Sequence, residues 1–401
     1  MKKTGILLLI VVMVAACNNK QTAEWKTLDP LLVDTTRAEC PYLTKNEKGH
    51  TVLSWIRMLN DSTTAFCYAE TKDGRTFSAP VVIPGTGQIQ PHGENLPKII
   101  FKPSGEIFAL WGTSNAGPRN KYAGQVFYTR SLDKGRTWTA PGPLVTDTAS
   151  YDQRYYDVAV LPSGEIAAIW LDNRKTIAKE GSGLYYAVTT PGKGFDQGRL
   201  ISQPCCQCCR TDLFVDHKGT LHVLYRGIVQ DSIRDMVHIM SADGQSFSAP
   251  KRISEDNWVI KGCPHTGPAI TENKEGLQVA WFTGGRNKGC FYARSQDGGK
   301  TFTAADSVSK MGSHPQVAAM DNGSLMIVWD ETNVKGTQVN KRIGWQWRTP
   351  EGSPVNKTYI TGSDGNAEFP VIMPVDQHSA LIAYTLNAGN KKRIACLLMT
   401  L

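Results

Sequence analysis

The feature that most constrains this chain is an internal repeat that runs through most of its length. In each copy an apolar, proline or threonine position is followed eight residues later by glycine, and six residues after that by an aromatic residue. Seven copies start 47 to 59 residues apart, and the last has histidine in place of glycine. The copies are Pro41, Gly49, Trp55; Pro97, Gly105, Trp111; Tyr156, Gly164, Trp170; Thr211, Gly219, Tyr225; Pro268, Gly276, Phe282; Pro315, Gly323, Trp329; and Pro370, His378, Tyr384. Such a period predicts a repeat architecture.

Each copy predicts a β-hairpin, because alternating apolar residues flank a polar turn that contains glycine, as in Ile107, Ala109 and Trp111 after Gly105. No stretch shows a sustained helical period. Two hairpins per repeat would form a four-stranded blade, and blades arranged in a closed ring leave few exposed sheet edges. The sequence therefore predicts an all-β, seven-bladed β-propeller.

A second motif follows four of the hairpins. Residues 131–138 (SLDKGRTW) and 295–302 (SQDGGKTF) share the pattern S-x-D-x-G-x-T-[WF], and residues 73–77 and 243–247 are shorter variants. The pattern suits a tight turn, since the aspartate can accept backbone N–H groups, glycine supplies positive φ and the aromatic ring can pack beneath the loop. We interpret these turns as structural.

These turns resemble the Asp boxes, or BNR repeats, of sialidase-like propellers, a group that includes bacterial exo-α-sialidase-like lipoproteins. The resemblance spans residues 24–401 and implies one propeller domain, with the six blades of sialidases as the alternative to seven. The last repeat ends at Cys396 to Met399 without an outer strand. Residues 24–33 are similar to the segments that follow the boxes, so we expect this N-terminal strand to complete the last blade.

The N-terminus predicts a lipoprotein signal peptide over residues 1–16. Lys2 and Lys3 precede an apolar run that is too short to span a bilayer, and the run ends in small residues before Cys17. The sequence VAAC at 14–17 resembles a bacterial lipobox, which implies that Cys17 is the lipid anchor and that 17–23 is a tether. Asn18 in place of aspartate favours the outer membrane. We therefore predict a lipid-anchored protein of the bacterial cell envelope.

Polar residues just before the first repeat position of each blade should converge at one mouth of the central channel. A concave ring of ionisable side chains is the default location for a site. Its members are Glu39 and Cys40; Glu94 and Asn95; Arg154 and Tyr155; Cys208, Cys209 and Arg210; His265 and Thr266; Ser313 and His314; and Glu368 and Phe369.

The resemblance implies an arginine triad that holds a substrate carboxylate. It also implies a tyrosine nucleophile assisted by a glutamate, and an aspartate that acts as the general acid. The family carries Arg-Ile-Pro in its first blade, but this chain has Glu39-Cys40-Pro41 there, so the first arginine is missing. The candidate catalytic residues are Glu39, Glu94, Arg154, Tyr155, Asp157, Arg210 and Glu368. The candidate substrate-binding residues are Arg37, Asn95, His265 and His314.

Six cysteines lie at or near these mouth positions, namely Cys40, Cys205, Cys206, Cys208, Cys209 and Cys263. An even number in an oxidising compartment favours three disulfides. Alternatively, Cys208, Cys209, Cys263 and His265 would bind Zn²⁺ or copper. Cys67, Cys290 and Cys396 lie in apolar strand sequences and are expected to be buried.

The functional hypothesis is an envelope-anchored propeller that binds or hydrolyses a glycan at the channel mouth. The formal net charge of +8 suits an acidic glycan or membrane headgroups. We expect a monomer that uses no cofactor, contacts the membrane only through its lipid and binds no nucleic acid. The alternatives are a Cys/His metal-binding or redox protein and a non-catalytic interaction scaffold.

Overall fold

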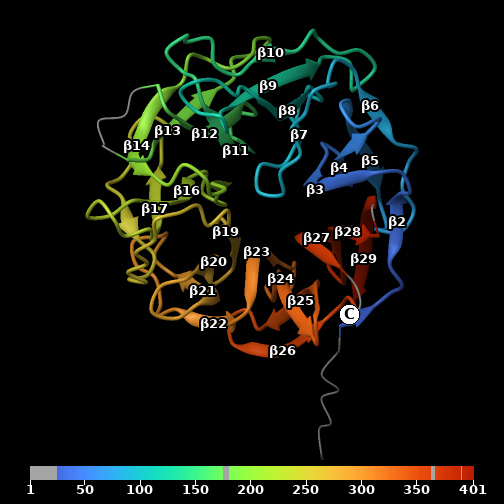
Figure 1. Cartoon of the computed structure of the whole chain (residues 1–401), viewed down its shortest axis with the longest axis vertical. Helices are drawn as coiled ribbons and strands as arrows, with labels where there is room; N and C mark the ends of the chain where they lie inside the picture. The colour runs from blue at the N-terminus through green and yellow to red at the C-terminus, as the bar shows by residue number, and fades with distance from the viewer. Residues whose placement is uncertain (1–24, 175–179, 363–365, 390) are drawn as a thin grey trace, which may run out of the picture.

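Seven antiparallel sheets surround a central channel in the computed structural model (Figure 1), which describes residues 25–174, 180–362, 366–389 and 391–401. All 29 regular elements in these ranges are strands. The prediction of a seven-bladed β-propeller is confirmed, and the six-bladed alternative is wrong. The predicted signal peptide, the tether and Cys17 lie outside the described residues.

Six blades are formed by four consecutive strands that follow one another from the channel to the rim (Figure 1). The first three blades comprise β3 (Ala38–Lys45), β4 (Thr51–Met58), β5 (Thr64–Thr71) and β6 (Val81–Ile83); β7 (Lys98–Phe101), β8 (Ile107–Ser114), β9 (Gly124–Ser131) and β10 (Gly142–Pro143); and β11 (Gln153–Val160), β12 (Ile166–Asp172), β13 (Ser182–Val188) and β14 (Arg199–Cys205). The next three comprise β15 (Asp212–Val215), β16 (Leu221–Arg226), β17 (Met236–Ser241) and β18 (Lys251–Arg252); β19 (Ala269–Asn273), β20 (Gly276–Thr283), β21 (Gly289–Ser295) and β22 (Asp306–Ser309); and β23 (Gly312–Ala319), β24 (Leu325–Lys335), β25 (Gln338–Arg348) and β26 (Pro354–Tyr359).

The repeat positions have the expected structural roles. The six repeat glycines all have positive φ, for example 87° at Gly105. Five of them lie in the turn between the first and second strands of the blade, and Gly276 is the first residue of β20. The repeat aromatic residues lie on the second strands, where Trp55, Trp170 and Trp329 are fully buried. These rings pack between neighbouring sheets, so the repeat encodes both the hairpin turn and the contact between blades.

The motifs at residues 131–138 and 295–302 form turns held by their own side chains. In the turn after β9, the Asp133 carboxylate accepts the Thr137 N–H at 2.8 Å and the Thr137 hydroxyl at 2.7 Å. These hydrogen bonds lower the pKa of Asp133 to about 2. The turn after β21 repeats the arrangement around Asp297, and Phe302 packs against the neighbouring core.

The seventh blade is completed by the N-terminal end of the described chain. It consists of β27 (Ala367–Asp376), β28 (Ser379–Ala388) and β29 (Lys391–Thr400), and both β1 (Lys26–Thr27) and β2 (Leu31–Asp34) pair antiparallel with β29. Figure 1 shows β2 beside β29, and the first and last described strands belong to one sheet. The predicted closure of the ring by the N-terminal strand is confirmed.

Asp34, at the end of β2, links this closing strand to the first blade. Its carboxylate accepts hydrogen bonds from the Trp55 ring N–H and the Arg57 guanidinium, both at 2.7 Å. Asp34 is only 3 % exposed. Burial alone would raise its pKa, but the donors around it lower the pKa instead. The closing strand is therefore fixed to blades on both sides.

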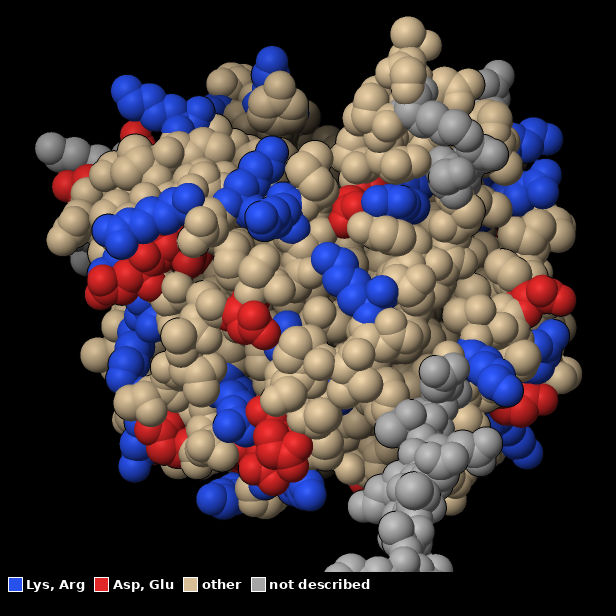
Figure 2. Space-filling view, turned by 90° about the horizontal axis from the view of Figure 1, so that it is seen from below, with Lys and Arg blue, Asp and Glu red and all other residues tan. Residues whose placement is uncertain are grey.

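On the side of the ring seen in Figure 2, basic and acidic side chains are interspersed. No described helix is long and apolar enough to cross a membrane.

Removing the closing strand should weaken the ring. We compare a chain that starts at Trp25 with one that starts at Thr35, which lacks β1, β2 and the Asp34 hydrogen bonds. We expect the shorter chain to lose several kcal/mol of unfolding free energy. This loss should lower the melting temperature by about 5 °C or more, since each kcal/mol shifts it by ~2–4 °C in domains of 150–250 residues. Equal melting temperatures in a thermal scan would contradict closure by this strand.

Candidate functional site

The innermost strands of four blades contain a bulge at the channel mouth. The register between the first and second strands shifts between Glu39 and Tyr42, and equivalent shifts occur in β11, β23 and β27. Each bulge contains a non-glycine residue with φ between 52° and 63°, namely Cys40, Tyr155, His314 and Phe369. Such left-handed conformations cost ~1–3 kcal/mol and persist only where surrounding contacts hold them.

A hydrogen bond to the preceding blade, or to the segment leading into it, holds each bulge. The backbone N–H of the left-handed residue donates to a side-chain oxygen in every case. The four pairs are Cys40 to Thr385 Oγ1 at 3.3 Å, Tyr155 to Asn95 Oδ1 at 2.8 Å, His314 to Thr266 Oγ1 at 3.2 Å and Phe369 to Asp330 Oδ2 at 3.0 Å. The predicted substrate-binding residue Asn95 thus has a structural contact of its own.

The connection between β6 and β7, residues 84–97, enters the channel (Figure 1). Its His92 ring lies 5.6 Å from the Tyr155 ring and 5.5 Å from the His265 ring. At Gly93 a Cβ atom would collide with the Phe369 ring, so only glycine fits there. The carboxylate of Glu94 accepts the Gly267 N–H at 2.6 Å. This connection therefore joins the third, fifth and seventh blades across the mouth.

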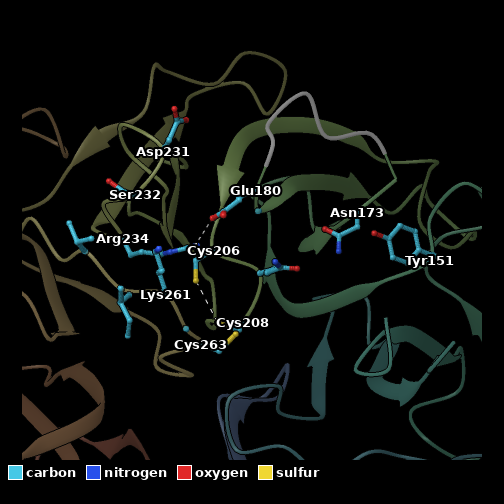
Figure 3. A pocket seen from close by; sticks show the side chains of 15 residues that line it. Tyr151, Asn173, Glu180, Cys206, Cys208, Asp231, Ser232, Arg234, Lys261 and Cys263 are labelled. Carbon is cyan, nitrogen blue, oxygen red and sulfur yellow. Dashed lines mark hydrogen bonds and ion pairs between the residues drawn. The ribbon is translucent and has the colours of Figure 1, made fainter. Parts of the chain in front are cut away.

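Beside this connection lies a groove made of two adjoining cavities. The mouth cavity has a volume of about 660 Å³, and the outer cavity of about 740 Å³ is drawn in Figure 3. The residues that line both are Tyr151, Asn173, Gln207, Cys208 and Cys263. A groove of this size can hold several sugar units.

Tyr155 and His265 contact each other in the mouth cavity. The Tyr155 hydroxyl lies 3.3 Å from His265 Nδ1. Burial raises the pKa of Tyr155, which keeps its hydroxyl protonated. Burial lowers the pKa of the neighbouring His92, whose Nδ1 accepts the Glu94 N–H at 3.2 Å, so His92 is neutral with its proton on Nε2. The cavity thus offers the buried hydroxyl of Tyr155 next to two imidazoles.

Two arginines line the same cavity. Arg154 donates Nε and Nη2 to the two oxygens of buried Asp152, both at 2.7 Å, which leaves its Nη1 donors unused by this pair. Burial opposes the charge of Arg154, but Asp152 outweighs it and raises the pKa. Arg119 is exposed, and its guanidinium lies 4.1 Å from the centre of the Tyr151 ring. The cavity is therefore suited to an anionic group.

None of the described residues that line the mouth cavity is a carboxylate. Among the predicted catalytic acids, Glu39 and Glu368 lie outside its lining and both contact Lys392, at 2.6 and 3.7 Å. Asp157 accepts Lys98 Nζ at 2.5 Å and the Leu213 N–H at 2.8 Å. These contacts give the three carboxylates structural partners.

Arg210 is buried at 6 % exposure and lies outside the lining of both cavities. Its Nη2 donates to the carbonyls of Gly267 and Pro315 at 3.3 and 3.2 Å, and its Nε lies 3.8 Å from Glu94. Nearby Asp212, which the sequence analysis missed, has its pKa raised to about 7 by burial and by Asp157. These groups form a charged network inside the ring.

The other predicted binding residues lie apart from the groove. His314 donates from Nδ1 to buried Asp330 at 2.7 Å, and its ring packs on Phe369 with the ring centres 4.4 Å apart. Arg37 pairs with exposed Asp61 at 3.0 Å on the surface. Of the predicted site residues, the mouth cavity brings together Asn95, Arg154, Tyr155, Cys208, Cys263 and His265.

All nine described cysteines are free thiols, so the three predicted disulfides are not formed. Cys40 packs in the core cluster of the first blade and is separated from the core that holds Cys205 to Cys209. The Sγ atoms of Cys206 and Cys208 lie 3.5 Å apart, and those of Cys206 and Cys209 lie 4.0 Å apart. Donation by these two thiols lowers the pKa of Cys206.

The sequence-based metal hypothesis named a different set of four residues. The structure groups Cys206 with Cys208 and Cys209, whereas Cys263 is exposed and His265 contacts Tyr155. The CCQCC sequence does contain this trio, but four adjacent cysteines do not show which three side chains turn toward one another.

No protein-family model and no curated protein sequence matches this chain. Solved structures do match. A protein of unknown function from Dyadobacter fermentans is 16 % identical with a TM-score of 0.58, covering 94 % of this chain and 99 % of its own. The polysaccharide lyase Uly1 is 10 % identical (TM-score 0.54, 91 % and 90 % covered), and the NanB sialidase of Streptococcus pneumoniae is 9 % identical (0.50, 90 % and 85 %). The chain has a sialidase-like propeller fold.

Replacing Arg210 should test its structural role. Arg210→Ala leaves Glu94 buried without its cation and two carbonyls without a donor, so we expect a loss of about 3–5 kcal/mol in urea unfolding. Arg37→Ala is the control, because its exposed ion pair should contribute less than about 1 kcal/mol. An unchanged unfolding free energy for Arg210→Ala would show that the buried network is not stabilising.

Proposed function

We propose that this protein binds an acidic polysaccharide in the groove and cleaves it by β-elimination at the mouth cavity. The observation that carries the proposal is the Tyr155–His265 pair beside Arg154, in a cavity with no described carboxylate in its lining. A uronate residue has the matching chemistry, since its carboxylate would bind to arginine and acidify the adjacent C–H group. The groove has the size for an oligosaccharide.

Hydrolysis fits this cavity less well. Most glycosidases need two carboxylates on either side of the bond, and sialidases pair a tyrosine nucleophile with an acidic residue. Here the Tyr155 hydroxyl contacts the His265 imidazole, and Glu39 and Glu368 contact Lys392 instead. Elimination requires no nucleophile, only a base, an acid and a cation that neutralises the substrate carboxylate.

The elimination step can be written with the groups present. With Nδ1–H of His265 donated to the Tyr155 oxygen, His265 Nε2 takes the proton from the carbon next to the carboxylate. The C–O bond at the neighbouring carbon breaks, a C=C bond forms, and the Tyr155 hydroxyl protonates the leaving oxygen. The imidazolium then returns its Nδ1 proton to tyrosinate through the 3.3 Å contact, which restores Tyr155 and leaves neutral His265 protonated on Nε2. Proton exchange with water, with loss from Nε2 and gain at Nδ1, then restores the starting tautomer of His265.

Each remaining group has a defined part in this scheme. Arg154 would hold the carboxylate through its free Nη1 donors, in the orientation that Asp152 fixes. Neutral His92 would donate its Nε2 proton without adding charge to the cavity. Tyr151 and Tyr122, which is 67 % exposed, offer ring faces for sugar units.

The comparisons support a glycan as the substrate class. The polysaccharide lyase and the sialidase named above act on carbohydrates with this propeller architecture, although their identities of 10 % and 9 % carry over the fold alone. The envelope location predicted from residues 1–17 stays a prediction. It would place the groove where extracellular polysaccharides occur.

The test is a panel of acidic polysaccharides assayed for unsaturated products by ultraviolet absorbance. We expect Tyr155→Phe to lower kcat by about 10²–10⁴-fold with little change in KM, because it removes the acid and keeps the ring. Tyr151→Phe is the matched control in the same groove and should retain activity. Product ends that are reducing but not unsaturated would show hydrolysis, and full activity in Tyr155→Phe would also refute the scheme.

A further inference from the structure

Three buried thiols form a compact group between the two cavities of the groove. Cys206, Cys208 and Cys209 are 1–2 % exposed, and their sulfur atoms all lie within 4.8 Å of one another. The separations of 3.5 and 4.0 Å are too long for disulfides, whose S–S length is about 2.05 Å. They are close to the ~3.8 Å expected between tetrahedral ligands with Zn–S bonds of about 2.3 Å.

Hydrogen bonds of the surrounding chain help to position these thiols. The chain leaves β14 in a turn at residues 206–209, and the Cys206 N–H donates to the Arg226 carbonyl at 2.7 Å. Cys205, at the end of the strand, directs its sulfur to the Ser202 carbonyl at 3.9 Å. Four neighbouring cysteines are therefore divided into three that converge and one that does not.

An independent observation is the buried cation beside the thiols. Arg226 is 1 % exposed, and its Nε donates to Cys209 Sγ at 3.3 Å. Its other donors contact the carbonyls of Arg234, Thr266 and Phe282 at 2.8 to 3.1 Å. The described carboxylate Asp256 interacts with Arg226 electrostatically, but the described hydrogen bonds of Arg226 go to Cys209 and to backbone carbonyls. A buried charge needs partners at short range, and the Cys209 sulfur atom contacts the guanidinium directly.

We propose that Cys206, Cys208 and Cys209 bind one Zn²⁺ ion as thiolates, with Arg226 as the counter-ion of the site. Three thiolates, one divalent cation and one guanidinium sum to zero charge, which removes the cost of burying any of them alone. A monovalent cation would leave the group negative. Sulfur ligands favour Zn²⁺ over Mg²⁺ or Ca²⁺, which prefer oxygen.

Two of the three proposed ligands line the groove, so a fourth ligand could reach the ion from there. Cys206 and Cys208 line the outer cavity together with Cys263, and Figure 3 shows these three residues near one another. Cys208 also lines the mouth cavity that contains Tyr155. A zinc site with three protein ligands keeps one position for water or a substrate oxygen. The ion would also fix Gln207 and Cys208, which form the wall shared by both cavities.

The experiment uses the full chain, reduced and kept free of oxygen, and titrates Zn²⁺ against a chromophoric competitor. We expect one ion per chain, a higher melting temperature with Zn²⁺, and X-ray absorption showing three sulfur ligands at about 2.3 Å. Cys206→Ser should bind at least tenfold more weakly. Cys205→Ala is the matched control, because it removes a buried thiol from the same segment and should bind like the parent.

Several outcomes would overturn the site. These are no Zn²⁺ uptake by the reduced, folded chain, equal affinity in Cys206→Ser, or fewer than three sulfur neighbours in the absorption spectrum. Uptake of Cu⁺ without Zn²⁺ would contradict the charge argument. The spectrum is recorded on the parent chain, so the test holds even if a variant fails to fold, and no readout depends on polysaccharide cleavage.

Discussion

The hydrogen bond from each inner-strand bulge to the preceding blade is the contact on which the mouth depends. A single buried hydrogen bond contributes ~1 kcal/mol, which does not offset a left-handed residue at ~1–3 kcal/mol. The conformation therefore persists only because packed inner strands and the closed ring act together with that bond. The Asn95 contact to the Tyr155 N–H shows the consequence, since it fixes the residue that we place at the chemistry.

The geometry of the site therefore depends on the closure of the ring. If β2 did not pair with β29, the seventh blade would lose its outer strand, and Asp34 could no longer hold Trp55 and Arg57. The first blade carries the connection of residues 84–97 into the channel, where His92 meets Tyr155. If the pairing of β2 with β29 were lost, these contacts would transmit the structural change to the channel mouth.

The two sides of the channel mouth carry different kinds of side chains. Towards the second to fifth blades it carries imidazoles, a phenol and arginines around the groove. Towards the sixth, seventh and first blades, Asp330, Glu368 and Glu39 alternate with Lys341 and Lys392 at separations of 2.6 to 3.7 Å. Carboxylates that are already paired with lysines are suited to a structural role. The groove instead holds hydrogen-bond donors that a substrate anion can use.

The sequence was sufficient for the blades, because hairpin turns and buried aromatic residues depend on neighbours close in the chain. Gly105 and Asp133 have the roles that local turn chemistry predicts. The direction of mouth side chains depends on contacts such as Glu94 to Gly267, 173 residues apart. Arg210 could therefore be placed near the mouth but not recognised as buried. The same limit hid Cys206 as the partner of Cys208 and Cys209.

The most direct test of the central claim is a crystal structure of the Tyr155→Phe variant with an acidic oligosaccharide bound. We expect a sugar carboxylate within about 3 Å of Arg154, with the adjacent C–H group facing His265. An oligosaccharide bound beside Glu39 and Glu368, with the groove unoccupied, would contradict the account.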